Sequence, residues 1–156
     1  MLCLYKCSIA LKQKSMKVFK LLILLCLYHT FPALAQKMDP KAVPQPVQEV
    51  FIKEFPGVMA DWELSKGQYI ASFKHNEYPM QTVYNAGGQR LETHVTIDEK
   101  ELPAPASDYM SNHNSAPVTE ATKIITHNDK VSFRVLAGTQ YMEFDSKGNY
   151  LRSRNK

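Results

Sequence analysis

The stretch that decides the fold opens with Val43-Pro44-Gln45-Pro46-Val47 and runs to Ile97, because its layout returns between Leu102 and Arg154. The first copy closes on the turn Tyr84-Asn85-Ala86-Gly87-Gly88-Gln89-Arg90-Leu91, and the second on Phe144-Asp145-Ser146-Lys147-Gly148-Asn149-Tyr150-Leu151. Equivalent residues lie 59 or 60 positions apart, as in the pairs Pro44 and Pro103, Gly88 and Gly148, and Leu91 and Leu151. A near-constant offset over a whole unit is what a tandem duplication leaves, so we predict two similar halves.

Each half begins with a helical pattern and continues with strand patterns. Apolar residues in the first half fall at i, i+3, i+4 and i+8, which is one stripe of a helix: Val47, Val50, Phe51 and Phe55. Pro56-Gly57 ends that helix. The second half repeats the spacing in Ala106, Tyr109, Met110 and His113, and its helix ends in the polar run 112–115. Alternating patterns predict strands at 60–64, 68–75, 80–84, 90–97, 118–127, 130–137, 140–145 and 150–154.

These patterns predict an α+β fold with two tandem repeats, 43–97 and 102–154. Each repeat is a helix followed by about four antiparallel strands, and both share a single domain at 43–154. We expect residues 36–42 to be a polar leader. We expect Asp98-Glu99-Lys100-Glu101 to be a charged linker, because it is too short to separate independent domains.

Residues 1–35 contain the three parts of a secretory signal peptide in order. Met16 to Lys20 is a basic n-region, Leu21 to Leu27 is an apolar run, and Ala33-Leu34-Ala35 is a cleavage site. The apolar run is too short to span a bilayer, which needs about 20 residues. We therefore expect cleavage after Ala35, export to the periplasm or the exterior, and no stable membrane insertion afterwards. A translation start at Met16 would leave the signal complete.

Removal of the signal changes the charge of the protein. The full chain carries 19 basic and 15 acidic residues, and five of the lysines lie in the signal, so the mature chain has 14 basic and 15 acidic residues. That balance predicts no basic surface for nucleic acid or anionic lipid.

All three cysteines are also removed with the signal, so the exported domain cannot form disulfides and must be stabilised by its hydrophobic core. A lipid anchor, the alternative to simple cleavage, needs a small residue before a cysteine, but Leu25 precedes Cys26.

Several of these motifs together resemble a known family. They are Val43-Pro44, Phe55-Pro56-Gly57, Trp62-Glu63, Tyr69-x-x-x-Phe73, the turn at 84–91, Leu102-Pro103 and Phe144-Asp145-x-x-Gly148. Over residues 43–154 the chain is similar to the PepSY-like, beta-lactamase-inhibitor-like proteins of Gram-negative envelopes. The resemblance implies a two-repeat α+β domain similar to beta-lactamase inhibitor protein, whose sheet face binds an enzyme. It implies no catalytic residue. The chain departs from the family at Asn114-Ser115, where Phe-Pro is usual, and at Asn85 and Gly87, where acidic residues are commoner.

The sequence lacks the residue patterns of catalysis and metal binding. Because the mature chain has no cysteine, no G-x-S-x-G motif and no glycine-rich phosphate loop, we predict no catalytic residues and no cofactor. The four histidines of the mature chain lie on separate elements and make no close ligand pair, so we predict no metal site: His75, His94, His113 and His127. Asp145-Ser146-Lys147-Gly148-Asn149 has lysine where a calcium loop needs an oxygen ligand, which favours a hairpin turn.

The remaining candidate site is the face of the sheet that the helices leave open. Antiparallel sheets commonly bury one face and expose the other. Strand alternation predicts that six polar side chains project from the exposed face: Lys74, Glu92, His94, Arg134, Tyr141 and Glu143. Tyrosine and arginine are enriched at binding hot spots, although an ordinary wetted face is the plainer interpretation of each residue alone.

The leading hypothesis is a non-catalytic exported protein that engages or inhibits another envelope protein, such as an enzyme, through this open face. The alternative is a periplasmic module that binds a small ligand or a metal in the cleft between the halves. A ligand that stabilises the folded protein would distinguish the second hypothesis from the first.

Overall fold

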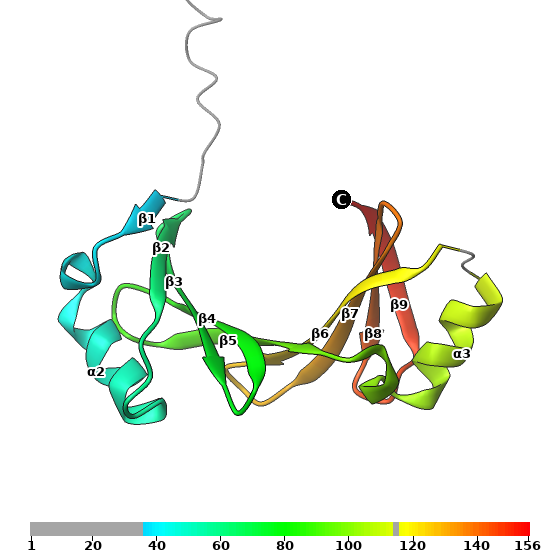
Figure 1. The fold of residues 1–156 in the computed structure, drawn as a ribbon, viewed down its shortest axis with the longest axis horizontal. Coiled ribbons are helices and arrows are strands. Elements are labelled where there is room, and N and C mark those ends of the chain that lie inside the picture. Colours follow the sequence, from blue (N-terminus) through cyan, green and yellow to red (C-terminus); the bar gives the residue numbers. More distant parts are fainter. Residues whose placement is uncertain (1–35, 114–115) are drawn as a thin grey trace, which may run out of the picture. The chain divides into compact units, whose positions relative to one another are not determined.

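The computed structural model describes residues 36–113 and 116–156. The predicted signal peptide at 1–35 and the departure at Asn114-Ser115 therefore lie outside the described residues. The α-helices of the described residues are α2 (Gln45–Glu54) and α3 (Ala104–His113), both labelled in Figure 1. No described helix is long and apolar enough to cross a membrane. The strands are β1 (Gln36–Met38), β2 (Asp61–Ser65), β3 (Gln68–His75), β4 (Tyr78–Tyr84), β5 (Arg90–Ile97), β6 (Val118–Thr126), β7 (Val131–Ala137), β8 (Gln140–Asp145) and β9 (Tyr150–Asn155).

All nine strands form one sheet in chain order from β1 to β9, and every neighbouring pair is antiparallel. Helix α2 precedes β2 to β5, and α3 precedes β6 to β9. The pairing of β5 with β6 joins the two groups of strands, with Thr96 opposite Thr122 and Ile97 opposite Ala121. The result is an α+β arrangement dominated by one antiparallel sheet.

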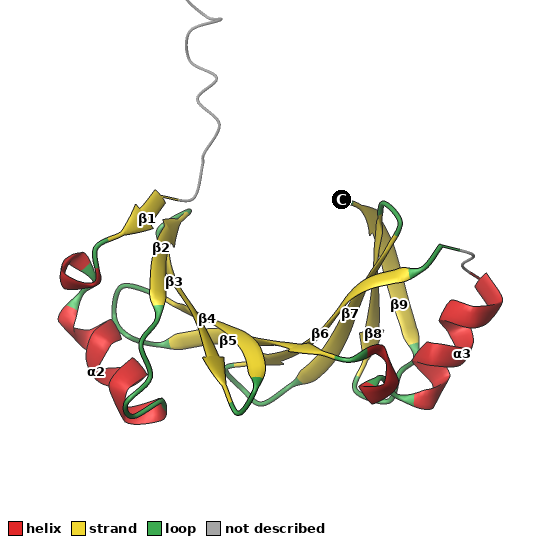
Figure 2. Ribbon diagram, viewed as in Figure 1, coloured by secondary structure: helices red, strands yellow, loops and turns green. Residues whose placement is uncertain are grey.

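The two faces of the sheet differ. In Figure 2 both α-helices lie on the same side of the strands, one near each end of the sheet. Residues paired across antiparallel strands point to the same side, and neighbours along a strand point to opposite sides. We call the side that packs against α2 and α3 the helix face, and the other side the open face. The open face includes Ser72, Gln81, Glu92, His94, Thr122, Arg134, Tyr141 and Glu143.

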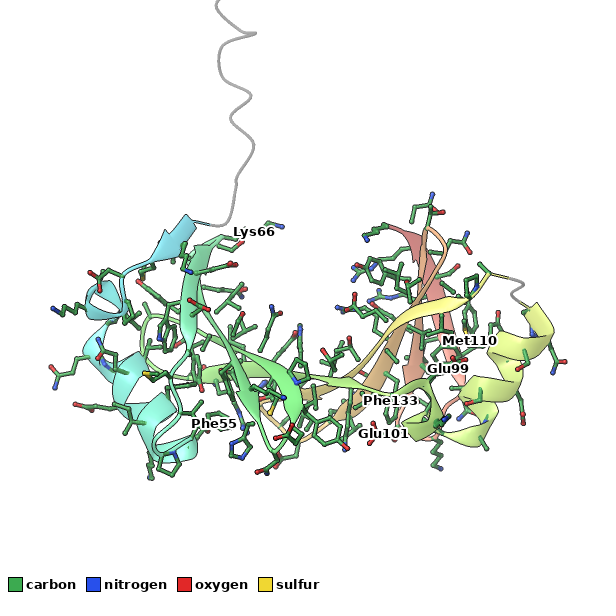
Figure 3. The ribbon with its side chains drawn as sticks, in the orientation of Figure 1. Phe55, Lys66, Glu99, Glu101, Met110 and Phe133 are labelled. Carbon is green, nitrogen blue, oxygen red and sulfur yellow. The ribbon has the colours of Figure 1, made fainter. Side chains whose placement is uncertain are left out.

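The helix face holds two buried clusters, one under each α-helix. Figure 3 shows Phe55 on the α2 side and Met110 on the α3 side. The cluster under α2 is rich in aromatic rings and contains Val43, Val47, Phe51, Phe55, Trp62, Ala71, Phe73 and Tyr84. The cluster under α3 contains Leu102, Ala106, Met110, Ala121, Phe133, Val135, Ala137, Met142 and Phe144. The predicted stripe of α2 is the one that it buries, whereas in the predicted stripe of α3 Ala106, Tyr109 and Met110 pack against the sheet but His113 is exposed.

The elements match the predicted patterns except at a few ends. Part of the expected leader forms β1, which pairs with β2 through Met38 opposite Trp62. Strand β4 begins at Tyr78 rather than Met80, because Asn76 and Glu77 alone make the turn with φ of 49° and 71°. The expected linker contains the 3₁₀ helix η2 (Glu99–Glu101), and Asp98 and Glu101 form a capping box at its N-terminus. A second 3₁₀ helix, η1 (Pro40–Ala42), lies in the leader.

Candidate functional site

The open face contains a hollow of about 460 Å³ that crosses strands from both groups. Its lining includes polar residues such as His94 and Arg134, the ring of Tyr141, and also Met80, whose side chain packs against the buried cluster under α2. Two smaller hollows lie elsewhere, one of about 310 Å³ beside α2 and one of about 290 Å³ lined by Tyr78, Val95 and Phe133. The largest concavity of the three is therefore on the face predicted to be functional.

Apolar side chains lie beneath this polar surface. Val83, Ile124 and Leu136 point to the open face by register, yet each is buried. Leu136 is paired with Glu120 on one side and with Tyr141 on the other. The open face is thus a packed surface with polar groups above it, and its shape is held by cross-strand packing.

All six predicted residues point to the open face, but their surroundings differ. His94, Arg134 and Tyr141 line the hollow. Lys74 is not among the residues that line the hollow. Its Nζ atom lies 3.0 Å from Oε2 of Glu77 in the same hairpin, and this ion pair is exposed. Whether any of the six contacts a partner stays a prediction.

Glu92 and His94 form a pair on β5. Their Oε2 and Nε2 atoms are 2.7 Å apart, and an ionised carboxylate only accepts, so Nε2–H of His94 donates. In the described part of the chain, this is the one hydrogen bond of the His94 side chain. The pair fixes the imidazole at the edge of the hollow.

Glu143 is the centre of an arginine cluster, which we define as Arg134, Arg152 and Arg154. Only 12% of its side chain is exposed. Arg152 contacts its Oε2 with Nε and Nη2, both at 2.7 Å. Nε of Arg134 and Nη2 of Arg154 each lie 3.5 Å from its Oε1. One mostly buried carboxylate therefore faces three guanidinium groups.

The arginines set the charge state of this carboxylate. Burial acts to raise the pKa of Glu143, but the hydrogen bond from Arg152 and the charges of all three arginines outweigh it, so the pKa lies below the ordinary value of 4.5. Glu143 stays ionised at neutral pH and holds the arginine cluster together.

We expect Glu143→Gln to lower the free energy of unfolding at pH 7 by about 1–2 kcal/mol, because it removes a charge-assisted hydrogen bond and leaves three cations close together. The folded-state pKa is depressed, so this stabilisation is present above the unfolded-state pKa and is lost as the pH falls through the folded-state pKa. Urea unfolding from about pH 7 to about pH 2 should show the wild-type advantage shrinking towards zero.

Glu77→Gln is the control, because that carboxylate is exposed and its one ion pair within the described part of the chain is with Lys74. It should change stability by less than about 0.5 kcal/mol at neutral pH. An advantage of wild type over Glu143→Gln that persisted unchanged in acid would contradict the proposed role of the carboxylate.

The six site residues predicted from the sequence do not include two members of this cluster, Arg152 and Arg154. Both lie on β9, two positions apart, so their alternation could have placed them on one face. Their partners depend on register, since Arg152 pairs with Glu143 and Arg154 with Tyr141 across β8 and β9. Arg154 also lies over the ring of Tyr141, with its guanidinium carbon 5.7 Å from the ring centroid.

Other groups on this face do not assemble into a metal site. Across the described ranges 36–113 and 116–156, no cluster of three or more histidine, cysteine, aspartate or glutamate side chains could hold an ion. His75, His113 and His127 lie on other elements, and His113 stacks on Tyr109 at 4.3 Å in α3.

Comparisons with known proteins support the fold. No protein-family model matches the sequence, and no curated protein is significantly similar to it. Among solved structures, a Bacteroides eggerthii protein described as periplasmic is 19% identical with a TM-score of 0.68, over 72% of this chain and 88% of its own. A Bacteroides uniformis protein of the DUF2874 family is 18% identical with a TM-score of 0.68, over 72% and 88%.

A BLIP-like protein of Bacteroides fragilis is also similar, with 20% identity and a TM-score of 0.59 over 72% of this chain and 86% of its own. The TM-scores of these structures show a common fold. The beta-lactamase-inhibitor-like part of the expected resemblance is thereby supported at the level of the fold. None of these three structures is described as PepSY-like, so that part of the resemblance stays a prediction.

Proposed function

We propose that the chain is an exported, non-catalytic binding protein that engages another envelope protein through the open face and, where that partner is an enzyme, inhibits it. The observation that carries the proposal is the 460 Å³ hollow on the face opposite the helices, lined by His94, Arg134 and Tyr141. Tyrosine and arginine in a central depression are the residue types on which protein interfaces concentrate their binding energy.

The location follows from two independent indications. The N-terminal sequence has the order of a secretory signal, and a structural neighbour is described as periplasmic. The BLIP-like neighbour supports a binding role on a fold of this kind. We therefore place the mature protein in the periplasm or outside the cell.

A tandem duplication explains the layout of the proposed binding face. In each half a side-chain oxygen accepts from two backbone N–H groups of the last turn: Asn85 from Gly87 and Gln89, and Asp145 from Lys147 and Asn149. In each half that turn also approaches the start of its own helix, through Gly88 at Pro46 and Gly148 at Pro103. Such equivalent details support two copies of one unit, paired through β5 and β6 to build one continuous face.

The test is affinity capture from an envelope extract with residues 36–156 immobilised, a range that lies within one compact unit. We expect Arg134→Ala/Tyr141→Ala to bind the captured protein at least tenfold more weakly than wild type, because it removes two central contacts. A control on α2, Ile52→Ala/Lys53→Ala, changes exposed residues of the opposite face and should retain the partner. Melting temperatures of all three proteins verify that they are folded.

Retention that is equal in wild type and Arg134→Ala/Tyr141→Ala, or absent from both, would refute open-face binding. The small-ligand alternative has one observation in its favour, since about 460 Å³ is within the usual size of ligand pockets. A small molecule or metal that raised the melting temperature of wild type but not of Arg134→Ala/Tyr141→Ala would favour it.

A further inference from the structure

We propose that the arginine cluster of Arg134, Arg152 and Arg154 recognises an acidic loop of the partner protein, through the carboxylates of aspartate or glutamate side chains. The inference rests on the proposed open-face function and adds the chemistry and the orientation of the partner. Acidic side chains of the partner would lie over β7, β8 and β9, and the adjoining loop would enter the hollow beside Tyr141.

Charge is the first argument. Three guanidinium groups converge on the single carboxylate of Glu143, so the cluster carries two positive charges that this carboxylate does not neutralise. Arginine is permanently ionised in proteins, so the excess does not depend on pH in the physiological range. Like charges held this close repel each other, and an added anion would relieve that repulsion.

Unused hydrogen-bonding capacity is the second argument. A guanidinium group has five N–H donors in a planar fork that matches a carboxylate. Among residues 36–113 and 116–156, only Arg152 hydrogen-bonds to Glu143. Nε of Arg134 and Oε1 of Glu143 are buried and 3.5 Å apart, yet neither has a hydrogen-bond partner among the described residues. The N–H donors of the three guanidinium groups outnumber the lone pairs of one carboxylate, so the exposed Arg152 and Arg154 have donors left for a second carboxylate.

Rigidity is the third argument. Arg152 is fixed by two contacts to Glu143, and Arg154 lies on the ring of Tyr141. Only a quarter of the Arg134 side chain is exposed. Because these long side chains are already held in place, binding loses less conformational entropy than it would with free surface arginines.

The surroundings favour an acidic protein loop over a long polyanion. Glu120 borders the same hollow, and Glu92 lies on the open face of β5. The mature chain carries 15 acidic against 14 basic residues. A nucleic acid laid across the sheet would meet these carboxylates, whereas a short loop can place its charges at the β7 to β9 end alone. The ring of Tyr141, which lines the hollow, can pack against the side chains of such a loop.

The experiment uses a defined probe, a short acetylated and amidated peptide of alternating glycine, glutamate and aspartate, titrated into residues 36–156 and followed by the arginine Nε–H signals in NMR. We expect the signals of the three arginines to shift. Arg152→Gln/Arg154→Gln should weaken binding about tenfold, because it removes two of the three cations that the probe contacts. Lys53→Gln/Lys147→Gln removes the same charge away from the open face and should change the affinity less than twofold. A peptide with glutamine and asparagine in place of the acids should not bind.

Equal binding by the two double variants, or equal binding of the acidic and amide peptides, would overturn the inference. Tighter binding of a single-stranded oligonucleotide than of the acidic peptide would overturn it as well. The inference and the proposed function can fail separately. A captured envelope protein that is lost from Arg134→Ala/Tyr141→Ala, but held by Arg152→Gln/Arg154→Gln with wild-type affinity, would refute the acidic-loop inference and leave open-face binding intact.

Discussion

Phe51→Ala should lower the free energy of unfolding by about 3–5 kcal/mol, because it opens a cavity in the most aromatic part of the core. Phe51 is 4% exposed, and its ring lies 5.2 Å from those of both Trp62 and Phe73. No side chain in α2 can move into the space that it fills without leaving its own contacts. Urea unfolding followed by the fluorescence of Trp62, the single tryptophan of the chain, measures the loss where the cavity forms.

Ile52→Ala is the matched control, since Ile52 is the next residue of the same helix and is 60% exposed. Its truncation should change stability by less than about 1 kcal/mol, because little apolar area leaves the interior and alanine favours a helix. Phe51→Leu keeps most of the volume and provides a folded intermediate if the alanine variant is too unstable to study. Equal losses for Phe51→Ala and Ile52→Ala would mean that α2 does not pack on the sheet through this face.

The two α-helices and most of the strands could be predicted because their signal is local. The stripe through Val47 and Phe51 has helical period, and the alternation of Tyr69, Ala71 and Phe73 has strand period, so each depends on neighbours in sequence. Strand β1 could not be predicted in this way. Residues 36–38 are too few to show a period, and they form a strand only because β2 offers an edge for pairing.

The sequence could predict which side of the sheet the candidate residues lie on, but not which of them form ion pairs with one another. Alternation places Arg134 and Glu143 on the same side of the sheet, which requires only the strand period. The ion pair between Glu143 and Arg152 requires the register of β8 with β9, and that register shifts between Glu143 and Phe144. A bulge of this kind changes which side chains meet without changing the pattern of either strand. The sequence therefore indicates Glu143 as a contact residue, whereas the structure places it among the arginines of its own chain.

Gly148→Ala should lower the free energy of unfolding by about 3 kcal/mol, the second largest loss that we expect. Gly148 has φ of 87°, a left-handed conformation that costs a residue with Cβ about 1–2 kcal/mol. A Cβ there would also lie 2.8 Å from Cβ of Pro103 and 2.9 Å from the backbone nitrogen of Ala106. These atoms belong to the start of the second half's helix, so α3 would have to move away from the sheet, and overpacking of this kind costs about 1–3 kcal/mol.

Gly57→Ala separates the two contributions. Gly57 has φ of 76°, close to that of Gly148, but a Cβ built there meets no atom within 4 Å. It should therefore lose only the conformational part, about 1 kcal/mol, when both variants are unfolded in urea under the same conditions. The difference between the variants measures how firmly the turn between β8 and β9 is held against α3. If the two variants lost equal stability, that contact would be loose, and α3 would have to be held by its buried stripe of Ala106 and Met110 alone.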